Sequence, residues 1–127
     1  MGKHFYLGLF ILLVLLLASV TVGCAMDILH APAQTLLSEA SENALDGNME
    51  KAIALSEDAY AHWRRFYSLT ACFADHTPMD EVERLFAEIK IYAQADDAVH
   101  FAACCSELAC LVSTISDAHQ FSWWNLL

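Results

Sequence analysis

The stretch FYLGLFILLVLLLASVTV, residues 5–22, contains no charged residue and decides how the rest of the chain is interpreted. As a helix it would be about 27 Å long, close to the roughly 30 Å of hydrocarbon that a spanning helix must cross. Leu, Ile, Phe and Val favour insertion and no charge opposes them, so the stretch predicts a membrane-spanning helix. Everything after it would then be tethered to a membrane.

The charges at the two ends of the stretch predict its orientation. Lys3 precedes it, with His4 beside it, and Asp27 is the first charge after it. The positive-inside tendency therefore predicts a single-pass signal-anchor in the cell membrane, with a cytoplasmic N-terminus and an extracytoplasmic C-terminal domain. A cleaved signal peptide is the alternative, although its apolar core would exceed the usual length of about 7–15 residues.

A lipoprotein signal is the third interpretation of this region. The sequence Thr-Val-Gly-Cys at residues 21–24 resembles a lipobox, in which Cys24 would be acylated and become the new N-terminus. Gly23 fits that pattern, whereas Thr21 stands where leucine is most usual. An uncleaved anchor is preferred, and either anchor leaves the domain outside and membrane-bound. Residues 1–26 are assigned to the anchor and residues 27–127 to a helical bundle domain.

The composition of the second part excludes several classes of partner. All sixteen acidic residues and five of the six basic residues follow the apolar stretch, so the chain after this stretch carries a net charge of −11. Nucleic acid and anionic lipid surfaces both require Lys and Arg patches. The sequence therefore predicts no nucleic-acid partner, and about 100 residues suffice for one small domain.

Helical periodicity recurs through this domain, and no segment alternates as a strand does. The first soluble helix would include residues 31–45, with a kink or break at Pro32, which cannot donate to the carbonyl of Ile28. Asp46-Gly47-Asn48 is a turn signal with Asn48 as the next N-cap. The sequence predicts an all-α fold, in which the membrane helix is followed by a small up-and-down bundle of about four helices.

The remaining helices follow from the same periodicity. The longest amphipathic run covers residues 49–74, and Thr77 is predicted as the N-cap of a third helix with Pro78 at its first position. Asp96 and Asp97 would cap a fourth. The predicted core includes Trp63, Phe66, Phe73, Leu85, Ile89 and Leu108. Cys72, Cys104 and Cys110 are interpreted as small apolar core residues, since free cysteine is among the most buried residue types.

Candidate catalytic and metal-binding groups lack the spacing that their chemistry needs. The histidines and carboxylates considered are His62, His76, His100, His119, Asp75 and Glu107. No H-E-x-x-H or E-x-x-H pair places two ligands on one inward helical face, and the C-x₂-C spacing of a zinc site is absent. There is no nucleophile elbow or phosphate loop. The sequence predicts a non-enzymatic protein without a metal or cofactor.

The C-terminal residues 121–127, Phe-Ser-Trp-Trp-Asn-Leu-Leu, are aromatic and apolar. In an up-and-down bundle they would return toward the bilayer, where Trp123 and Trp124 would suit the membrane–water interface. The alternative, weighted equally, is that this tail folds back and closes the open end of the bundle core.

Two resemblances accompany this interpretation. Residues 47–59 resemble the opening of a tetratricopeptide helix pair, although no 34-residue period recurs. The whole chain resembles a bacterial family of small uncharacterised membrane-anchored proteins that contain a domain of unknown function. Trp63, the pair Asp75-His76 and the terminal Asn125-Leu126-Leu127 carry that resemblance. It implies membrane attachment and an all-helical body, and it implies no activity.

The sequence thus favours an accessory or interaction protein that binds another integral membrane or envelope protein. A small ligand- or metal-binding sensor domain is the first alternative. A tetratricopeptide-like helical-hairpin binding module is the second.

Overall fold

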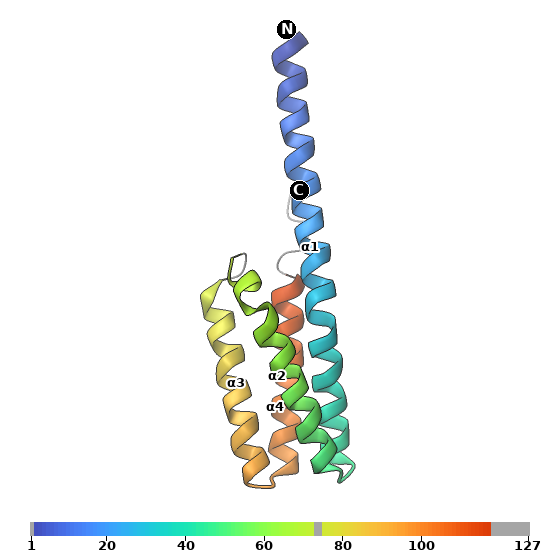
Figure 1. Ribbon diagram of the computed structural model, residues 1–127, viewed down its shortest axis with the longest axis vertical. Helices are drawn as coiled ribbons and strands as arrows, with labels where there is room; N and C mark the ends of the chain where they lie inside the picture. The colour runs from blue at the N-terminus through green and yellow to red at the C-terminus, as the bar shows by residue number, and fades with distance from the viewer. Residues whose placement is uncertain (1, 73–74, 118–127) are drawn as a thin grey trace.

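Every secondary-structure element in the described residues, 2–72 and 75–117 of this computed structural model, is a helix. The elements are α1 (Gly2–Leu45), α2 (Met49–Ala71), α3 (His76–Gln94) and α4 (Ala98–Asp117). Figure 1 shows a four-helix bundle beyond which the N-terminal part of α1 projects. The predicted all-α fold, a long apolar N-terminal helix followed by a helical bundle, is confirmed.

The helices alternate in direction, as the short connections predict. α1 runs from its projecting end into the bundle, and α2 runs antiparallel to it, back toward that end. α3 runs away from that end, and α4 runs toward it beside α1 (Figure 1). α1 packs extensively against α4 and α2, and α3 packs mainly against α4, whereas α2 and α3 make the smallest of these interfaces. The C-terminal ends of α2 and α4 and the start of α3 therefore lie at the end from which α1 projects (Figure 1).

The predicted break at Pro32 is wrong, because α1 continues through it as one helix of 44 residues. At about 1.5 Å per residue such a helix is roughly 66 Å long. Ala33, the residue after Pro32, is completely buried, and burial in α1 begins at Gly23. Packing of α1 against two neighbouring helices thus outweighs the loss of one backbone hydrogen bond at the proline.

The core follows a seven-residue repeat of alternating four- and three-residue steps. In α1 the buried positions on this repeat are Gly23, Met26, His30, Ala33, Leu37, Ala40 and Ala44. In α4 they are Phe101, Cys105, Leu108, Val112 and Ile115. This spacing is that of coiled-coil seams, and the alanines in α1 allow its neighbours to approach closely. The core therefore consists of side chains packed along the seams between neighbouring helices.

The turns use the residues that the sequence indicated at two of the three connections. Gly47 has a positive φ of 86°, and the Asn48 side chain accepts a hydrogen bond from the Lys51 amide at 3.3 Å. Asp96 adopts a left-handed φ of 53° after α3, and Asp97 accepts from the His100 amide at 3.1 Å. These contacts cap α2 and α4 as predicted.

The predicted start of α3 is wrong. The helix begins at His76, so Thr77 and Pro78 already lie in its first turn, and Asp75 occupies the N-cap position without a side-chain cap hydrogen bond. Pro78 is compatible with this register because the amides of the first turn have no intrahelical acceptor. The local pattern therefore located the helix but placed its first residue too late.

Most of the predicted core residues are in the interior. Trp63 and Leu108 are fully buried, and Leu85 and Ile89 are 1 % and 2 % exposed. Phe66 differs, because it is only partly buried and its ring lies 5.1 Å from that of His62 on the same helix. The fully buried His30 contacts Trp63 and Thr70, the buried α2 residues on either side of Phe66 in the sequence. Phe73 lies outside the described residues.

Candidate functional site

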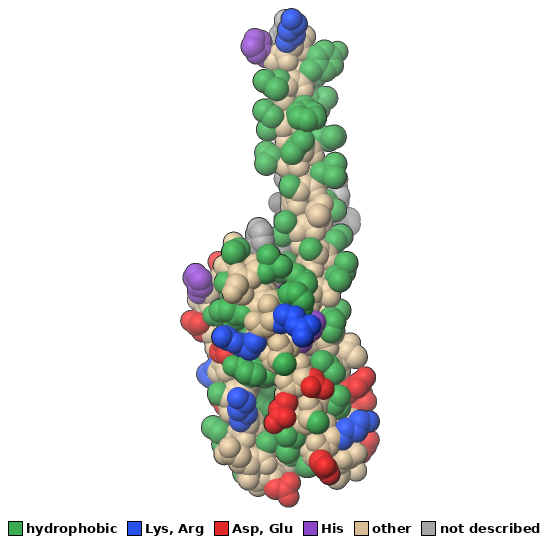
Figure 2. Space-filling model, in the orientation of Figure 1, with side chains coloured by type: hydrophobic (Ala, Val, Ile, Leu, Met, Phe, Trp, Pro, Cys, Tyr) green, Lys and Arg blue, Asp and Glu red, His purple; other side chains and the backbone are tan. Residues whose placement is uncertain are grey.

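The N-terminal half of α1 carries exposed apolar side chains on all sides. Its large apolar residues from Phe5 to Val20 are between 39 % and 69 % exposed, and they cover the upper part of the molecule in Figure 2. Within the described residues, α1 and α4 are long and apolar enough to cross a membrane. α4 packs into the bundle, whereas the apolar window of α1 is almost wholly exposed. The length and composition of α1 fit both a membrane anchor and a signal sequence.

Three polar contacts join the helices directly below this exposed stretch. The hydroxyl of Ser116 on α4 donates to the Asp27 carboxylate on α1. One turn further, His30 Nε2 lies 3.2 Å from Thr70 Oγ1 on α2. The Nε2 atom of His62, also on α2, lies 2.6 Å from the carbonyl oxygen of Leu29. The turn of α1 from Asp27 to His30 is thus bound to both of its neighbours.

The direction of two of these hydrogen bonds follows from the partners. A carbonyl oxygen can only accept, so His62 must donate from Nε2 to Leu29. Thr70 donates its single hydroxyl proton to the Phe66 carbonyl at 3.0 Å, so it accepts from His30 Nε2. Both imidazoles therefore carry a proton on Nε2 and act as structural donors between α1 and α2.

His62 binds a backbone carbonyl of α1 in the turn before Pro32. A proline inside a helix removes one amide donor and pushes the carbonyls of the preceding turn outward. Leu29 lies in that preceding turn, and its carbonyl receives the His62 proton from the neighbouring helix. The carbonyl that loses its amide partner at Pro32 is that of Ile28, so this bond ties α2 to the turn before the proline without replacing the lost bond. Packing of α1 against α2 and α4 keeps the helix continuous there.

A second polar group lies on α3, at Glu83. Its carboxylate accepts from the Trp63 indole Nε1–H at 2.9 Å and from Arg64 at 3.3 Å. The Tyr60 hydroxyl lies 3.5 Å from its other oxygen. Buried indoles usually find a partner for their N–H, and Glu83 supplies it from the edge of the core. This contact is the main polar connection between α2 and α3.

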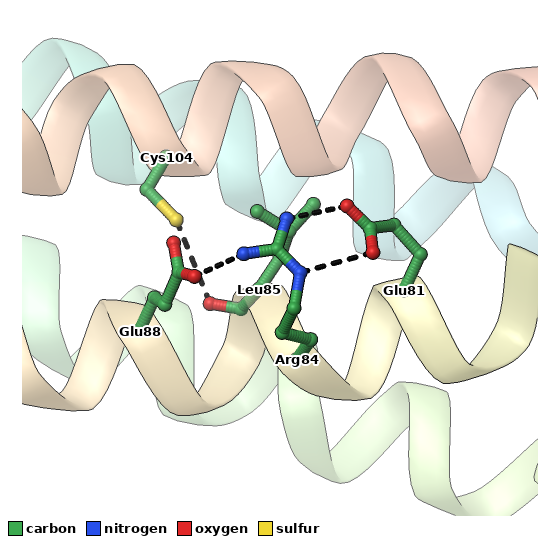
Figure 3. Close-up of polar contacts among 5 residues, drawn as sticks. All are labelled: Glu81, Arg84, Leu85, Glu88 and Cys104. Atoms are coloured by element: carbon green, nitrogen blue, oxygen red, sulfur yellow. Dashed lines mark hydrogen bonds and ion pairs between the residues drawn. The ribbon is translucent and has the colours of Figure 1, made fainter.

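Arg84 lies on the surface of α3 between two carboxylates of the same helix. It binds Glu81 one turn before and Glu88 one turn after, as Figure 3 shows. The Glu81 hydrogen bond lowers the pKa of that carboxyl and raises the pKa of Arg84. All three groups are open to solvent, where such pairs contribute little to stability. This cluster is best explained as a solvated helix face.

The five cysteines divide into two classes. Cys104 and Cys105 are buried, whereas Cys24, Cys72 and Cys110 are exposed, so the assignment of Cys72 and Cys110 to the core is wrong. Cys110 lies outside the seven-residue repeat of α4, and Cys72 follows the last residue of α2. Cys24, the residue that the lipoprotein alternative would acylate, lies in α1 next to the first buried residue, Gly23.

The buried thiols have little thiolate at neutral pH. Burial raises the pKa of Cys104 to about 11 and that of Cys105 to about 12. The Glu88 and Glu107 carboxylates raise the Cys104 pKa further. The Cys104 thiol donates to the Leu85 carbonyl at 3.5 Å, across the α3–α4 interface drawn in Figure 3. Both groups are inert core residues rather than nucleophiles.

Thiol alkylation of the full chain in mild detergent at pH 8 tests this division. Cys72 and Cys110 should react readily, while Cys104 and Cys105 should react about a hundredfold more slowly, because the thiolate is the reactive form. Protection of Cys104 should decrease as the pH rises toward 11. Peptide mass spectrometry measures each site, and denaturation in urea is the control that should equalise them. Equal rates in the native chain would contradict the assigned burial.

A groove lies at the small α2–α3 interface. Two adjoining cavities of about 310 and 240 Å³ share Ser56, Glu57, Ile89 and Lys90 as lining residues. Lys90 Nζ lies 4.8 Å from the centre of the Tyr60 ring, beside the groove. The lining combines apolar side chains with one charge of each sign, Glu57 and Lys90, around a space large enough for a small molecule.

The structure does not bring the candidate metal ligands together. Within residues 2–72 and 75–117, no three His, Cys, Asp or Glu side chains could hold a metal ion. His100 instead pairs with Asp97 at 2.7 Å at the start of α4, and His76 begins α3. His119, Trp123 and Trp124 lie outside the described residues. The sequence reasoning missed His30 and Thr70, whose positions on the seven-residue repeats were the available signal.

Comparison with known proteins places the chain in a family. A search of curated proteins and a search of solved structures each found no match. A family model does match, over residues 29–126, which is the bundle without the exposed half of α1. The match covers most of the chain and agrees with the predicted resemblance. The chain belongs to the family described as Domain of unknown function (DUF4363).

Proposed function

We propose that this protein is a non-enzymatic accessory or interaction module, anchored in the cell membrane by α1 with its bundle on the extracytoplasmic side. The observation that carries the proposal is the continuity of α1. One helix contains both the exposed apolar stretch and the buried seam that begins at Gly23. An anchor joined in this way holds a bundle at a fixed height and orientation above a bilayer.

The charge distribution supports the orientation and the kind of partner. Lys3 precedes the apolar stretch and all the acidic residues follow it, in agreement with a cytoplasmic N-terminus. Figure 2 shows acidic side chains over the lower body and none on the projecting helix. With a net charge of −11, the bundle would favour another membrane or envelope protein over nucleic acid. Electrostatic complementarity would then favour a partner with a basic face.

The first experiment identifies the form of the anchor. Intact mass spectrometry of the membrane-extracted chain should give the mass of the uncleaved sequence. A Cys24→Ser variant should stay in the membrane fraction, because the anchor would be α1 itself. The lipoprotein alternative would be established by two results together: an N-terminus at an acylated Cys24 in the unsubstituted chain, and loss of membrane attachment in the Cys24→Ser variant.

The second experiment tests the interaction role. A tagged full-length chain, crosslinked in cells and purified in mild detergent, should recover one partner in stoichiometric amount. A chain with its first 26 residues exchanged for an unrelated spanning helix is the matched control. Repeated recovery of an isolated monomer with a bound metal or metabolite would overturn the proposal. That result would favour a sensor, for which the groove beside Lys90 is the available binding space.

A further inference from the structure

Two large apolar side chains are exposed where the bundle meets the projecting part of α1. Ile28 on α1 is 74 % exposed and Leu69 on α2 is 46 % exposed. Leu69 precedes Thr70, which contacts His30, so both side chains belong to the same end of the bundle. Three other large apolar residues, Leu45, Ile91 and Val99, are exposed at the opposite end, near the α1–α2 and α3–α4 turns.

The position of this end along α1 corresponds to the headgroup layer of a bilayer. Twenty helical residues cover the roughly 30 Å of hydrocarbon, and counted from Phe5 they end at Cys24. Ile28 then lies about 6 Å further, within the roughly 5–8 Å that headgroups add on each side. α1 is continuous here and packs against α2, so Leu69 is held near the same depth.

The charges of α2 suit the same location. Its acidic residues are Glu50, Glu57 and Asp58, and the second half, residues 59–71, contains only Arg64 and Arg65 as fully charged residues. Arg64 is bound to Glu83 and lies over the Tyr67 ring at 4.8 Å. Arg65 is exposed and makes no ion pair with any described residue. It precedes Leu69 by four residues, so the two share one face of α2.

We propose that the α1–α2 shoulder, defined as Ile28, Arg65 and Leu69, rests in the headgroup layer of the membrane. Ile28 and Leu69 contact the apolar boundary, and the Arg65 guanidinium binds lipid phosphates. This inference rests on the proposed membrane attachment. The ligand is the phosphate that zwitterionic lipids also carry, since the negative net charge of the bundle disfavours a strongly anionic surface. The shoulder would fix the tilt of the bundle on the bilayer.

Spin labels on the full chain in phosphatidylcholine vesicles test the depth of the shoulder. Cys24, Cys72 and Cys110 are replaced by serine, and the buried Cys104 and Cys105 are left in place. Single labels are attached through Ile28→Cys, Leu69→Cys, Val99→Cys and Leu13→Cys. Because all four side chains are exposed, labelling removes no core contact. Collision rates with oxygen and with a water-soluble nickel chelate report membrane depth.

The expected result is a ratio of oxygen to nickel collisions at positions 28 and 69 about threefold or more above that at Val99, because interfacial side chains lie about 5–10 Å into the headgroup–acyl boundary. Position 13 should give the highest ratio. If position 13 is in the bilayer while 28 and 69 match Val99, the shoulder is wrong and the anchor stands. If position 13 is aqueous, both proposals are overturned.

A charge substitution tests the role of Arg65. In the chain labelled at position 69, Arg65→Gln should lower the oxygen-to-nickel ratio toward the Val99 value. Lys51→Gln, at an exposed position near the start of α2, is the matched control and should leave the ratio unchanged. An unchanged ratio with Arg65→Gln would remove the phosphate contact from the proposal.

Discussion

Replacing Trp63 by alanine is expected to lower the free energy of unfolding by about 3–5 kcal/mol, the usual cost of truncating a fully buried large aromatic side chain. Trp63 is completely buried on the α2 seam. Its ring lies 5.5 Å from that of His30 on α1, and its Nε1–H donates to Glu83 on α3 at 2.9 Å. The side chain therefore connects three helices. Such a loss would be a large share of the stability of a small domain.

Urea denaturation of the full chain in mild detergent, followed by far-ultraviolet circular dichroism, measures this loss without relying on tryptophan fluorescence. Arg64→Ala is the matched control, because Arg64 is next to Trp63 in the sequence and its side chain is half exposed. It should change the free energy of unfolding by less than about 0.5 kcal/mol. Trp63→Phe should fall between the two, since it keeps an aromatic ring and loses the bond to Glu83. A loss below about 1 kcal/mol for Trp63→Ala would show that the core is assigned wrongly.

The sequence predicted those parts of the fold that depend on local signals. Asp46-Gly47-Asn48 marks a turn because glycine alone adopts its φ of 86° without strain, and Asn48 carries a capping oxygen. The unbroken apolar run after His4 similarly needs no tertiary information. At Pro32, where tertiary packing competes with a local preference, the predicted break is wrong because the packing comes from α2 and α4, which are distant along the chain.

The candidate site was less predictable than the fold. The contact between Asp27 and Ser116 joins residues separated by 89 positions, and the contact between His30 and Thr70 joins residues separated by 40. Their pairing depends on how antiparallel helices are aligned, which periodicity does not specify. The seven-residue repeat does place His30 on the buried face. It indicates a buried imidazole, but the partner becomes identifiable only when α2 is positioned beside it.

The bond between His30 and Thr70 can be measured as an interaction free energy. Thr70 is fully buried, and Thr70→Val keeps its shape while removing the oxygen that accepts from His30. A buried donor that loses its acceptor costs about 1–3 kcal/mol, and we expect a destabilisation in that range. Thr35→Val is the matched control, because Thr35 also donates to the carbonyl four residues earlier, at 3.1 Å, but is exposed. It should cost less than about 0.5 kcal/mol.

The second substitution, His30→Leu, separates the bond from the packing around it. The imidazole also packs 5.5 Å from the Trp63 ring, so His30→Leu alone should be destabilising. In the double variant the site loses donor and acceptor together, and replacing both by apolar groups is far less costly than removing one. The double variant should therefore cost less than the sum of the single variants by at least about 0.5 kcal/mol. Strict additivity would mean that these two side chains do not interact, and that the seam and the His62–Leu29 hydrogen bond hold α1 and α2 together below the apolar stretch.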